Sequence, residues 1–318
     1  MSDPSGFLDG KRICVTGGGG FLGSYVIERL KQQGATDIFV PRKADYDLVD
    51  GAAVRRLLSD VQPQVVLHLA ANVGGIGANR AHPAEFFYDN LMMGVQLLHE
   101  SWKQGVEKFV AVGTVCSYPK FTPVPFKEVD FWGGYPEETN APYGLAKKML
   151  LVQSQSYRHQ YGFNSIYLIP VNLYGPEDNF DLETSHVLPA LLRKTHDARR
   201  GAGKRTLEIW GAGTARREFL HIDDCADALV YLMAVYSAAA HINVGSGAEV
   251  TIEELARLIM RVVGLDGVIE KDLARPGGTP RKLMDSARLN ALGWSASIPL
   301  EDGIRMTYAD APFRALTP

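Results

Sequence analysis

The feature that most constrains the fold of this chain is the glycine-rich segment Thr16-Gly-Gly-Gly-Gly-Phe-Leu-Gly23, which directly follows the apolar run Arg12-Ile-Cys-Val-Thr16. Glycines allow a tight turn, and they let backbone N–H groups come close to a phosphate at a helix N-terminus. A strand, a turn containing Gly17, Gly20 and Gly23, and a following helix are typical of a dinucleotide-binding unit. The alternative is a packing turn that merely needs small residues.

Short apolar runs alternate with amphipathic stretches over the first two thirds of the chain, which predicts an α/β fold with a Rossmann-type doubly wound parallel sheet. We expect strands at 12–16, 37–40, 64–70, 108–113, 164–170 and 241–245, and long helices at 23–33 and 83–104. A further helix should carry Tyr143 and Lys147, with Pro142 in its first turn and Thr139 or Asn140 as its cap.

The alternation ends at about Tyr174, where Gly, Pro and polar residues crowd 175–180 and again 275–281. We interpret these insertions as a smaller α/β substrate-binding lobe over the carboxyl edge of the sheet. The predicted dinucleotide-binding Rossmann domain comprises 1–175 and 216–248, and the predicted substrate-binding lobe comprises 176–215 and 249–318.

Charge and cysteine content argue against a nucleic-acid-binding, membrane or metal-binding protein. A net charge of -3 and the absence of a long apolar run give no sign of a nucleic-acid or membrane partner. Three widely spaced cysteines suit reduced thiols and offer no metal-ligand pattern, so we expect a cytoplasmic protein without a metal site.

Tyr143 and Lys147 are separated by four positions, which places the phenol and the ammonium on one face of a helix. A positive charge beside a phenol should lower its pKa. Tyr143 is therefore a candidate proton donor to a carbonyl being reduced, or a base toward an alcohol being oxidised. The Tyr-x-x-x-Lys pattern is common by chance, but behind a dinucleotide loop it indicates redox chemistry on a carbonyl.

The second strand ends in Val40-Pro-Arg42-Lys43 rather than in the acid expected for NAD, which favours NADP(H) because two cations can neutralise a 2′-phosphate. The alternative is that Arg42 and Lys43 are ordinary loop charges, and Gly18-Gly19 supplies no further cation. The other residues expected at the cofactor are Phe21 and Leu22, Asp47 and Leu48 at the end of a next strand, Ala70 and Ala71, and Pro170, Asn172 and Leu173.

Together these features resemble the extended short-chain dehydrogenase/reductase superfamily, and further motifs are similar to the GDP-L-fucose synthase family from about residue 11 to residue 305. The motifs are His68-Leu-Ala-Ala-Asn-Val-Gly-Gly-Ile76, Cys116-Ser-Tyr-Pro-Lys120, Asn172-Leu-Tyr-Gly-Pro-Glu-Asp-Asn-Phe180, Ser185-His-Val-Leu-Pro-Ala190, Arg217-Glu-Phe-Leu-His-Ile-Asp-Asp224 and Gly278-Thr-Pro-Arg-Lys282. The resemblance implies NADPH-dependent epimerisation of GDP-4-keto-6-deoxymannose at C3 and C5, followed by reduction at C4 to GDP-L-fucose. It also implies a homodimer that pairs through the helices at 83–104 and 142–161.

The resemblance assigns roles to five residues. Cys116 and His186 hold the positions of the acid–base pair for epimerisation, and both side-chain types have ordinary pKa values within about two units of neutrality. Tyr143 would donate the proton for reduction, Lys147 would orient the ribose, and the Thr114 hydroxyl would bind the ketone oxygen. Alternatively, Cys116 is a small buried hydrophobe and His186 caps a helix start.

Cations in the later part of the chain are candidates for binding a sugar-nucleotide diphosphate, namely Arg193, Arg217 and Lys282. Lys194 is a further candidate, although it could simply be solvated, and Trp210 could stack on a base or pack in the lobe. The remaining expected substrate contacts are Asn172, Asn179, His186 and Val187.

Departures from the family pattern bear on the sugar. Thr114-Val115 stands where the family has two serines, Ser117 replaces an apolar residue, and Gly277 replaces an acid. Another GDP-keto-sugar such as a heptose is therefore an alternative substrate. A nucleotide-sugar epimerase with tightly held NAD(P) is a rival enzyme, whereas an inactive dinucleotide sensor is disfavoured because Tyr143 and Lys147 are both present.

Overall fold

The computed structural model describes residues 5–201, 205–275 and 279–315, and in that part of the chain six parallel strands form the main sheet. Their order is β2-β1-β3-β4-β5-β9. The strands are β1 (Arg12–Thr16), β2 (Asp37–Phe39), β3 (Val65–His68), β4 (Lys108–Val112), β5 (Ser165–Pro170) and β9 (Ile242–Val244). The inner strands are buried along their whole length because helices cover both faces of the sheet. The predicted Rossmann-type fold is confirmed, with strands a little shorter than expected.

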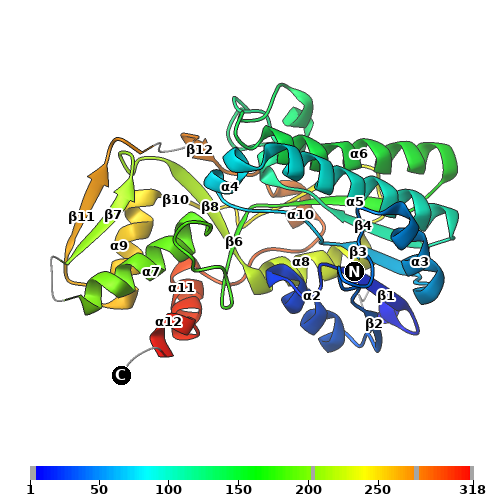
Figure 1. The fold of residues 1–318 in the computed structure, drawn as a ribbon, viewed down its shortest axis with the longest axis horizontal. Coiled ribbons are helices and arrows are strands. Elements are labelled where there is room, and N and C mark those ends of the chain that lie inside the picture. The colour runs from blue at the N-terminus through cyan, green and yellow to red at the C-terminus, as the bar shows by residue number, and fades with distance from the viewer. Residues whose placement is uncertain (1–4, 202–204, 276–278, 316–318) are drawn as a thin grey trace.

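Helices cover the two faces of this sheet in separate layers (Figure 1). One layer contains α2 (Phe21–Gln32) and α8 (Ile222–Val235), which pack against each other. The other layer contains α3 (Gly51–Val61), α5 (Pro83–Lys103) and α6 (Ala141–Tyr161). No helix within the described residues is both long enough and apolar enough to cross a bilayer.

Two local predictions are wrong in this lobe. Helix α2 begins at Phe21 rather than Gly23, because the glycine turn closes earlier. No strand precedes Asp47: the described chain between β2 and α3 is held in turns, in which the Asp45 N–H donates to the Arg42 carbonyl at 3.0 Å and the Asp47 carboxylate accepts from the Val49 N–H at 3.0 Å. These short-range hydrogen bonds compete with a strand ladder.

Helix α6 begins close to where the sequence predicts, with Pro142 in its first turn. Asn140 occupies the N-cap position, but neither backbone donor of the first turn binds its side chain. The Asn140 amide instead donates to the Glu137 carboxylate at 2.7 Å. Asn140 is therefore the N-cap residue, as predicted, but its side chain does not cap the helix.

The second lobe is built around two small sheets. One pairs β7 (Thr206–Trp210) with β11 (Val268–Asp272), and the other joins β6 (Asn172–Tyr174), β8 (Arg216–His221), β10 (Glu249–Thr251) and β12 (Arg281–Lys282). Its helices are α7 (Val187–Arg200), α9 (Ile252–Val263), α11 (Leu300–Ala309) and α12 (Pro312–Ala315). Short elements elsewhere are α1 (Ser5–Leu8), α4 (Ile76–Ala81), α10 (Ala287–Ala291), η1 (Val115–Ser117) and η2 (Glu128–Trp132).

Two separate hydrophobic cores correspond to the two lobes. Strand β8 lies between them, because Leu220 packs in the first core and Phe219 in the second. The segment after β12 returns to the first core through Met284, Leu289 and Trp294. The domain boundaries proposed from the sequence remain a prediction, and these residues show where the chain passes between the cores.

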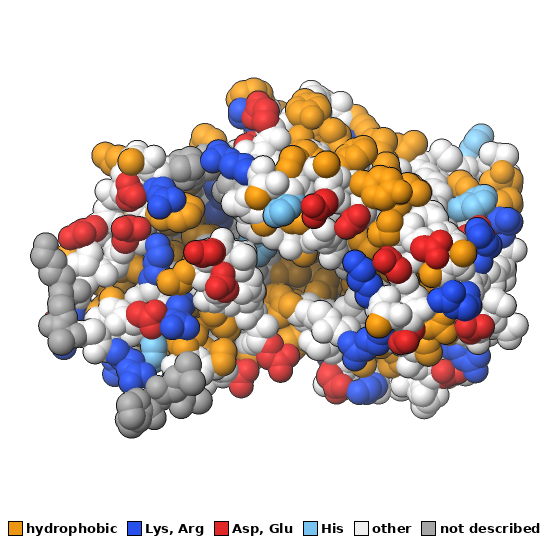
Figure 2. All heavy atoms as spheres, viewed as in Figure 1, with side chains coloured by type: hydrophobic (Ala, Val, Ile, Leu, Met, Phe, Trp, Pro, Cys, Tyr) orange, Lys and Arg blue, Asp and Glu red, His pale blue; other side chains and the backbone are white. Residues whose placement is uncertain are grey.

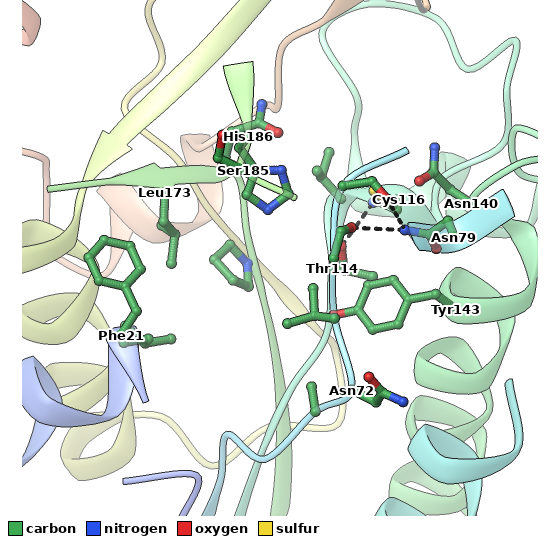
Figure 3. A pocket seen from close by; sticks show the side chains of 18 of the residues that line it. Phe21, Asn72, Asn79, Thr114, Cys116, Asn140, Tyr143, Leu173, Ser185 and His186 are labelled. Carbon is green, nitrogen blue, oxygen red and sulfur yellow. Dashed lines mark hydrogen bonds between the residues drawn. The ribbon is translucent and has the colours of Figure 1, made fainter. Parts of the chain in front are cut away.

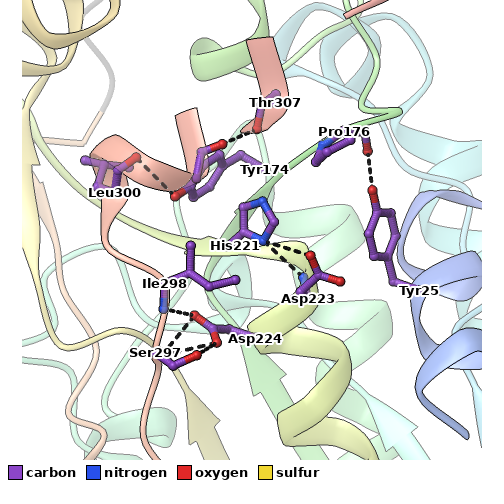
Figure 4. Close-up of polar contacts among 11 residues, drawn as sticks. Tyr25, Tyr174, Pro176, His221, Asp223, Asp224, Ser297, Ile298, Leu300 and Thr307 are labelled. Atoms are coloured by element: carbon purple, nitrogen blue, oxygen red, sulfur yellow. Dashed lines mark hydrogen bonds and ion pairs between the residues drawn. The ribbon is translucent and has the colours of Figure 1, made fainter. Parts of the chain in front are cut away.

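Polar contacts fasten the last segment of the chain to α8 (Figure 4). The Asp224 carboxylate accepts from the Ser297 hydroxyl at 2.8 Å and from the Ile298 N–H at 2.9 Å. His221 is buried, and its Nδ1 accepts from the Asp223 N–H at 3.3 Å, so this imidazole caps α8. The Tyr25 hydroxyl of α2 donates to the Pro176 carbonyl at 3.1 Å, which ties the start of the second lobe to the first.

Candidate functional site

A cleft of about 970 Å³ lies between the two lobes, at the carboxyl ends of the parallel strands. Figure 2 shows the surface hollowed between the lobes, with hydrophobic side chains in the depression. The order of the main sheet reverses between β1 and β3, and ligands of open α/β sheets bind at such a switch point. The loops after β1, β3, β4 and β6 all contribute to its walls.

The glycine turn after β1 has the geometry of a phosphate cradle. Gly17 has φ of +73°, and a Cβ there would lie 2.6 Å from the Ala70 nitrogen. A Cβ on Gly23 would overlap the Gly17 carbonyl oxygen. Gly20 is the N-cap residue of α2 and has no side chain to bind the first N–H groups of the helix, and residues 20–23 line the cleft. The residues present therefore fit a dinucleotide pyrophosphate.

Most residues that the sequence places at the cofactor line this cleft. They are Gly17, Gly20, Phe21, Leu22, Gly23, Lys43, Asp47, Leu48, Ala70, Ala71, Tyr143, Lys147, Pro170, Asn172 and Leu173. Arg42 is exposed beside the cleft, and its guanidinium lies so close to Gly19 that a Cβ there would overlap it. Arg42 and Lys43 thus flank the glycine loop from the end of β2.

Tyr143 and Lys147 project from α6 into the cleft. Burial raises the pKa of the Tyr143 phenol, the nearby Cys116 raises it further, and a hydrogen bond with the Thr114 side chain lowers it. Burial lowers the pKa of Lys147 to about 8. The lowered Tyr143 pKa expected from the sequence is not found in this structure, because burial, which removes water from around the phenol, raises that pKa.

Cys116 and His186 come from different lobes and face each other across the cavity (Figure 3). Cys116 is partly buried in the short turn η1, and its N–H donates to the Thr114 hydroxyl at 3.2 Å. His186 occupies the N-cap position of α7, but no capping hydrogen bond forms through its side chain. The ring is exposed to the cleft, and the protein around it lowers the pKa of the imidazole. The capping alternative for His186 is therefore not supported.

A short turn and an inter-lobe contact hold the segment that leads to His186. The Asp181 carboxylate accepts from the Thr184 N–H at 3.0 Å and from its hydroxyl at 2.9 Å. Gly75, in the loop after β3, packs against this turn, and a Cβ on it would lie 3.2 Å from the Thr184 carbonyl oxygen. The loops on the Cys116 and His186 sides of the cleft are thus in contact with each other.

The predicted substrate-binding residues are only partly brought together. Asn172, His186, Val187, Lys194, Trp210, Arg217 and Lys282 line the cleft. Asn179 does not line it: it is exposed, and its amide donates to the Thr184 hydroxyl at 2.9 Å. Arg193 does not line it either, because it pairs with Asp197 at 2.8 Å and lies over the Phe313 ring. Gly277 and Gly278 lie outside the described residues.

Trp210 is 43% exposed and presents its ring to the cleft. Lys194 and Arg275 each place a cation over this ring, at 5.6 Å and 4.9 Å from its centre. The Arg217 guanidinium is partly buried, which lowers its pKa, whereas the nearby Cys116 raises it. The second lobe thus contributes an aromatic face, Trp210, and a cation, Arg217, to the wall of the cleft.

Several polar residues of the cleft were not predicted from the sequence. Asn79 is buried, and its amide donates to the carbonyls of Gly74 and Gly75 at 2.9 Å and 3.0 Å. Asp178 has a buried carboxylate oxygen without a hydrogen-bond partner, and burial raises its pKa to about 7. Others in the lining are Asn72, Glu137, Asn140 and Ser185. Asn72 and Asp178 belong to the family-like motifs, which was the signal available in the sequence.

The chain is also similar to known proteins over nearly its whole length. A model of the NAD dependent epimerase/dehydratase family matches residues 13–245. GDP-L-fucose synthase 1 of Arabidopsis thaliana is 44% identical over 97% of this chain and 94% of its own length. A GDP-L-fucose synthase of Sinorhizobium fredii is 44% identical over 96% of each chain.

A solved structure is similar in fold as well as in sequence. A GDP-mannoheptose C4 reductase from Campylobacter jejuni with NADP bound superposes with a TM-score of 0.85 and 33% identity, covering 94% of this chain and 97% of that one. The glycine cradle, the Tyr143–Lys147 pair and these matches all point to the same family. The chain belongs to the NAD dependent epimerase/dehydratase family, and within it to the enzymes similar to GDP-L-fucose synthase.

Proposed function

We propose that this protein catalyses NADPH-dependent 3,5-epimerisation and 4-reduction of GDP-4-keto-6-deoxymannose, or of a closely related GDP-keto-sugar. One observation carries this proposal: Cys116 and His186 face each other in the same cleft as Tyr143 and Thr114. One bound sugar can thus reach both an acid–base pair that moves protons on its carbons and a phenol that donates a proton to its ketone oxygen. The similar GDP-L-fucose synthases support the same reading.

Epimerisation uses the acidity of the carbons beside the C4 ketone. A base removes the proton from C3 or C5, the electron pair moves onto the ketone oxygen, and an acid returns a proton to the opposite face of the carbon. Cys116 and His186 approach from opposite sides of the cleft and can take these two parts. Burial lowers the pKa of His186 and so favours the neutral imidazole, which accepts a proton; the imidazolium that results can then donate that proton to the carbon.

Reduction requires a proton on the ketone oxygen and a hydride on C4. A bound nicotinamide cofactor supplies the hydride. The raised pKa of Tyr143 keeps its phenol protonated until negative charge develops on that oxygen. Thr114 places a second hydroxyl beside the phenol. Lys147 is buried on the next turn of α6 and would hold the nicotinamide ribose.

NADPH is the proposed cofactor because Arg42 and Lys43 are exposed beside the glycine loop, where a 2′-phosphate would lie. The similar Campylobacter reductase is described with NADP bound. The guanine nucleotide would lie in the second lobe, where Trp210 offers an aromatic face and Arg217 and Lys282 offer cations.

A GDP-heptose is the second candidate substrate, because the similar Campylobacter enzyme is a GDP-mannoheptose reductase. An epimerase that returns its hydride is the remaining alternative, and it differs by consuming no NADPH. Both are separated from the main proposal by the product and by the stoichiometry.

We also propose a cytoplasmic homodimer that pairs through α5 and α6. Both helices contain many apolar residues; of these, Phe86, Leu97, Leu150 and Leu151 are already buried within the subunit, whereas Phe87 is exposed. Tyr88, Val152 and Tyr161 are further large apolar residues exposed on the described parts of these helices. The three cysteines are free thiols, which suits a reducing compartment. A monomer in light scattering at micromolar concentration would contradict the dimer.

The direct test is incubation of the purified protein with GDP-4-keto-6-deoxymannose and NADPH, with the product identified by NMR. We expect GDP-L-fucose and one NADPH consumed for each product molecule. Tyr143→Phe is the control: it keeps the ring but loses the acidic proton, so turnover should fall about 10²–10⁴-fold while NADPH still binds. Turnover without net NADPH oxidation would indicate the epimerase instead, and turnover only of a GDP-keto-heptose would change the sugar.

A further inference from the structure

Lys148 follows Lys147 on α6 but points away from the cleft, into the interior. Its side chain is only 2% exposed. The ammonium donates to the Ser117 carbonyl at 3.3 Å and to the Phe131 carbonyl. It also lies over the rings of Phe131 and Trp132, at 4.4 Å and 4.5 Å from their centres. One side chain thus joins α6 to the two short turns η1 and η2.

A buried ammonium is costly unless it is paired. No carboxylate within the described residues forms an ion pair with Lys148, and burial lowers its pKa to about 8. Two carbonyl oxygens and two aromatic faces provide the compensation. A side chain that only filled space at this position would be apolar, so the hydrogen bonds to the two turns are what this residue adds.

The turn that Lys148 holds is the one that carries Cys116. Ser117 is the next residue, and its hydroxyl donates to the Gly144 carbonyl of α6 at 2.7 Å. The Cys116 carbonyl lies so close to α6 that a Cβ on Gly144 would be 2.6 Å from its oxygen. The Cys116 turn therefore rests on α6 one residue from Tyr143, and Lys148 fastens its far end.

We propose that Lys148 is a positioning residue for epimerisation, which clamps the Cys116 turn onto α6 and so fixes the thiol relative to the sugar carbons. The inference rests on the proposed function of Cys116. It separates the two neighbouring lysines of α6: Lys147 lies in the cleft, and Lys148 acts from behind it through the Ser117 carbonyl.

The first test follows the turn itself and needs no substrate. Lys148→Met keeps the length and apolar body of the side chain but removes the donors, so the amides of residues 116–118 should lose protection. In hydrogen–deuterium exchange mass spectrometry we expect these amides to exchange about 10-fold faster, while those in the middle of α6 stay unchanged. Unchanged protection at 116–118 would overturn the clamp.

The second test measures catalysis with NADP⁺ in place of NADPH, so that proton exchange can be followed without reduction. In deuterated water, Lys148→Met should incorporate deuterium at C3 and C5 about 10²-fold more slowly than the wild type, because misplacement of a catalytic group by about 1 Å costs that much. Cofactor affinity should stay within about 2-fold. Lys148→Arg, which keeps cationic donors, should recover part of the rate.

Lys120→Met is the matched control, because Lys120 lies in the same loop region and pairs with Glu138 at the surface, 2.8 Å away. It removes one positive charge and should leave deuterium incorporation unchanged. Lys148→Gln keeps N–H donors on a shorter chain and should give an intermediate loss, and it carries the test if Lys148→Met does not fold. If Lys148→Gln and Lys148→Met both incorporated deuterium at C3 and C5 at the wild-type rate, the inference would be refuted. If the wild type itself incorporated no deuterium at these carbons, the proposed function would be refuted instead.

Discussion

The backbone N–H of Cys116 donates a hydrogen bond of 3.2 Å to the hydroxyl of Thr114. The same hydroxyl forms a hydrogen bond with the Tyr143 side chain. Thr114 therefore connects the thiol proposed for epimerisation to the phenol proposed for reduction. Epimerisation and reduction both depend on this side chain at the end of β4, so a substitution of Thr114 should affect both reactions.

Thr114→Val should impair both reactions, because it keeps the shape but removes the hydroxyl that caps η1 and contacts Tyr143. We expect NADPH oxidation to fall about 10–10²-fold and deuterium incorporation at C3 and C5 to fall with it. Thr114→Ser is the matched control and should retain most of both activities. Loss of reduction alone in Thr114→Val would show that the contact with Cys116 has no part in epimerisation.

Arg42 and Lys43 should determine the preference between cofactors. Replacing both by alanine should weaken NADPH far more than NADH, because only NADPH carries the 2′-phosphate. Each charge-assisted hydrogen bond contributes about 1.5–3 kcal/mol, so the preference should fall at least 10-fold. Dissociation constants from fluorescence titration with both cofactors measure this. Equal losses for NADPH and NADH would mean that these cations do not contact the phosphate.

Glu218 should make stability depend on pH. Its carboxyl is buried and accepts from the N–H groups of Gly247 and Met284, and burial raises its pKa to about 7. A glutamate in the unfolded chain titrates near pH 4.3, so the folded state binds the proton more tightly. The stabilisation from this proton is full below about pH 4 and is lost as the pH rises through 7, and it is on the order of 3 kcal/mol.

Urea unfolding of the wild type and of Glu218→Gln at several pH values checks this. The free energy of unfolding of the wild type relative to the variant should decrease between pH 5 and pH 8. Glu270→Gln, on the exposed face of β11, is the control for removal of a carboxyl. A wild-type to Glu218→Gln difference that is constant over this range would show that the Glu218 carboxyl does not change its protonation there.

Features set by adjacent residues were predictable from the sequence. Gly23 packs against Gly17 and Gly18 of its own segment, and Gly17 has positive φ, so this turn could be recognised from adjacent residues, whereas the close approach of Gly17 to Ala70 joins distant segments. The strands of the main sheet are apolar on both faces and could be recognised in the same way. Between Val40 and Asp50 the polar side chains and carbonyls satisfy one another in turns, and a two-residue apolar pattern at Asp47-Leu48 was not enough to predict the outcome.

The substrate side of the site depends on contacts between distant segments. Arg193 and Lys194 are adjacent, but a step of one residue turns the side chain by about 100° around a helix, so only one of them lines the cleft. Charge alone could not choose between them. Asn79 was missed for a different reason: its partners, the carbonyls of Gly74 and Gly75, are close in the chain, but no sequence pattern marks an asparagine that binds them. Cys116 and His186 were placed together by family resemblance and not by any pattern in the sequence.

The central claim is that Cys116 handles carbon-bound protons while Tyr143 handles reduction, and deuterium incorporation by Cys116→Ser tests it most directly. Serine keeps the size and hydrogen bonding of cysteine, but an alcohol is a far weaker acid than a thiol. In deuterated water with NADPH, the wild type should place deuterium at C3 and C5. The serine variant should place little or none, while it still reduces some unepimerised ketone to a D-configured 6-deoxyhexose. His186→Asn should fail after abstraction, because proton return to the opposite face is lost. Incorporation of deuterium at both carbons by Cys116→Ser at the wild-type rate would contradict the account.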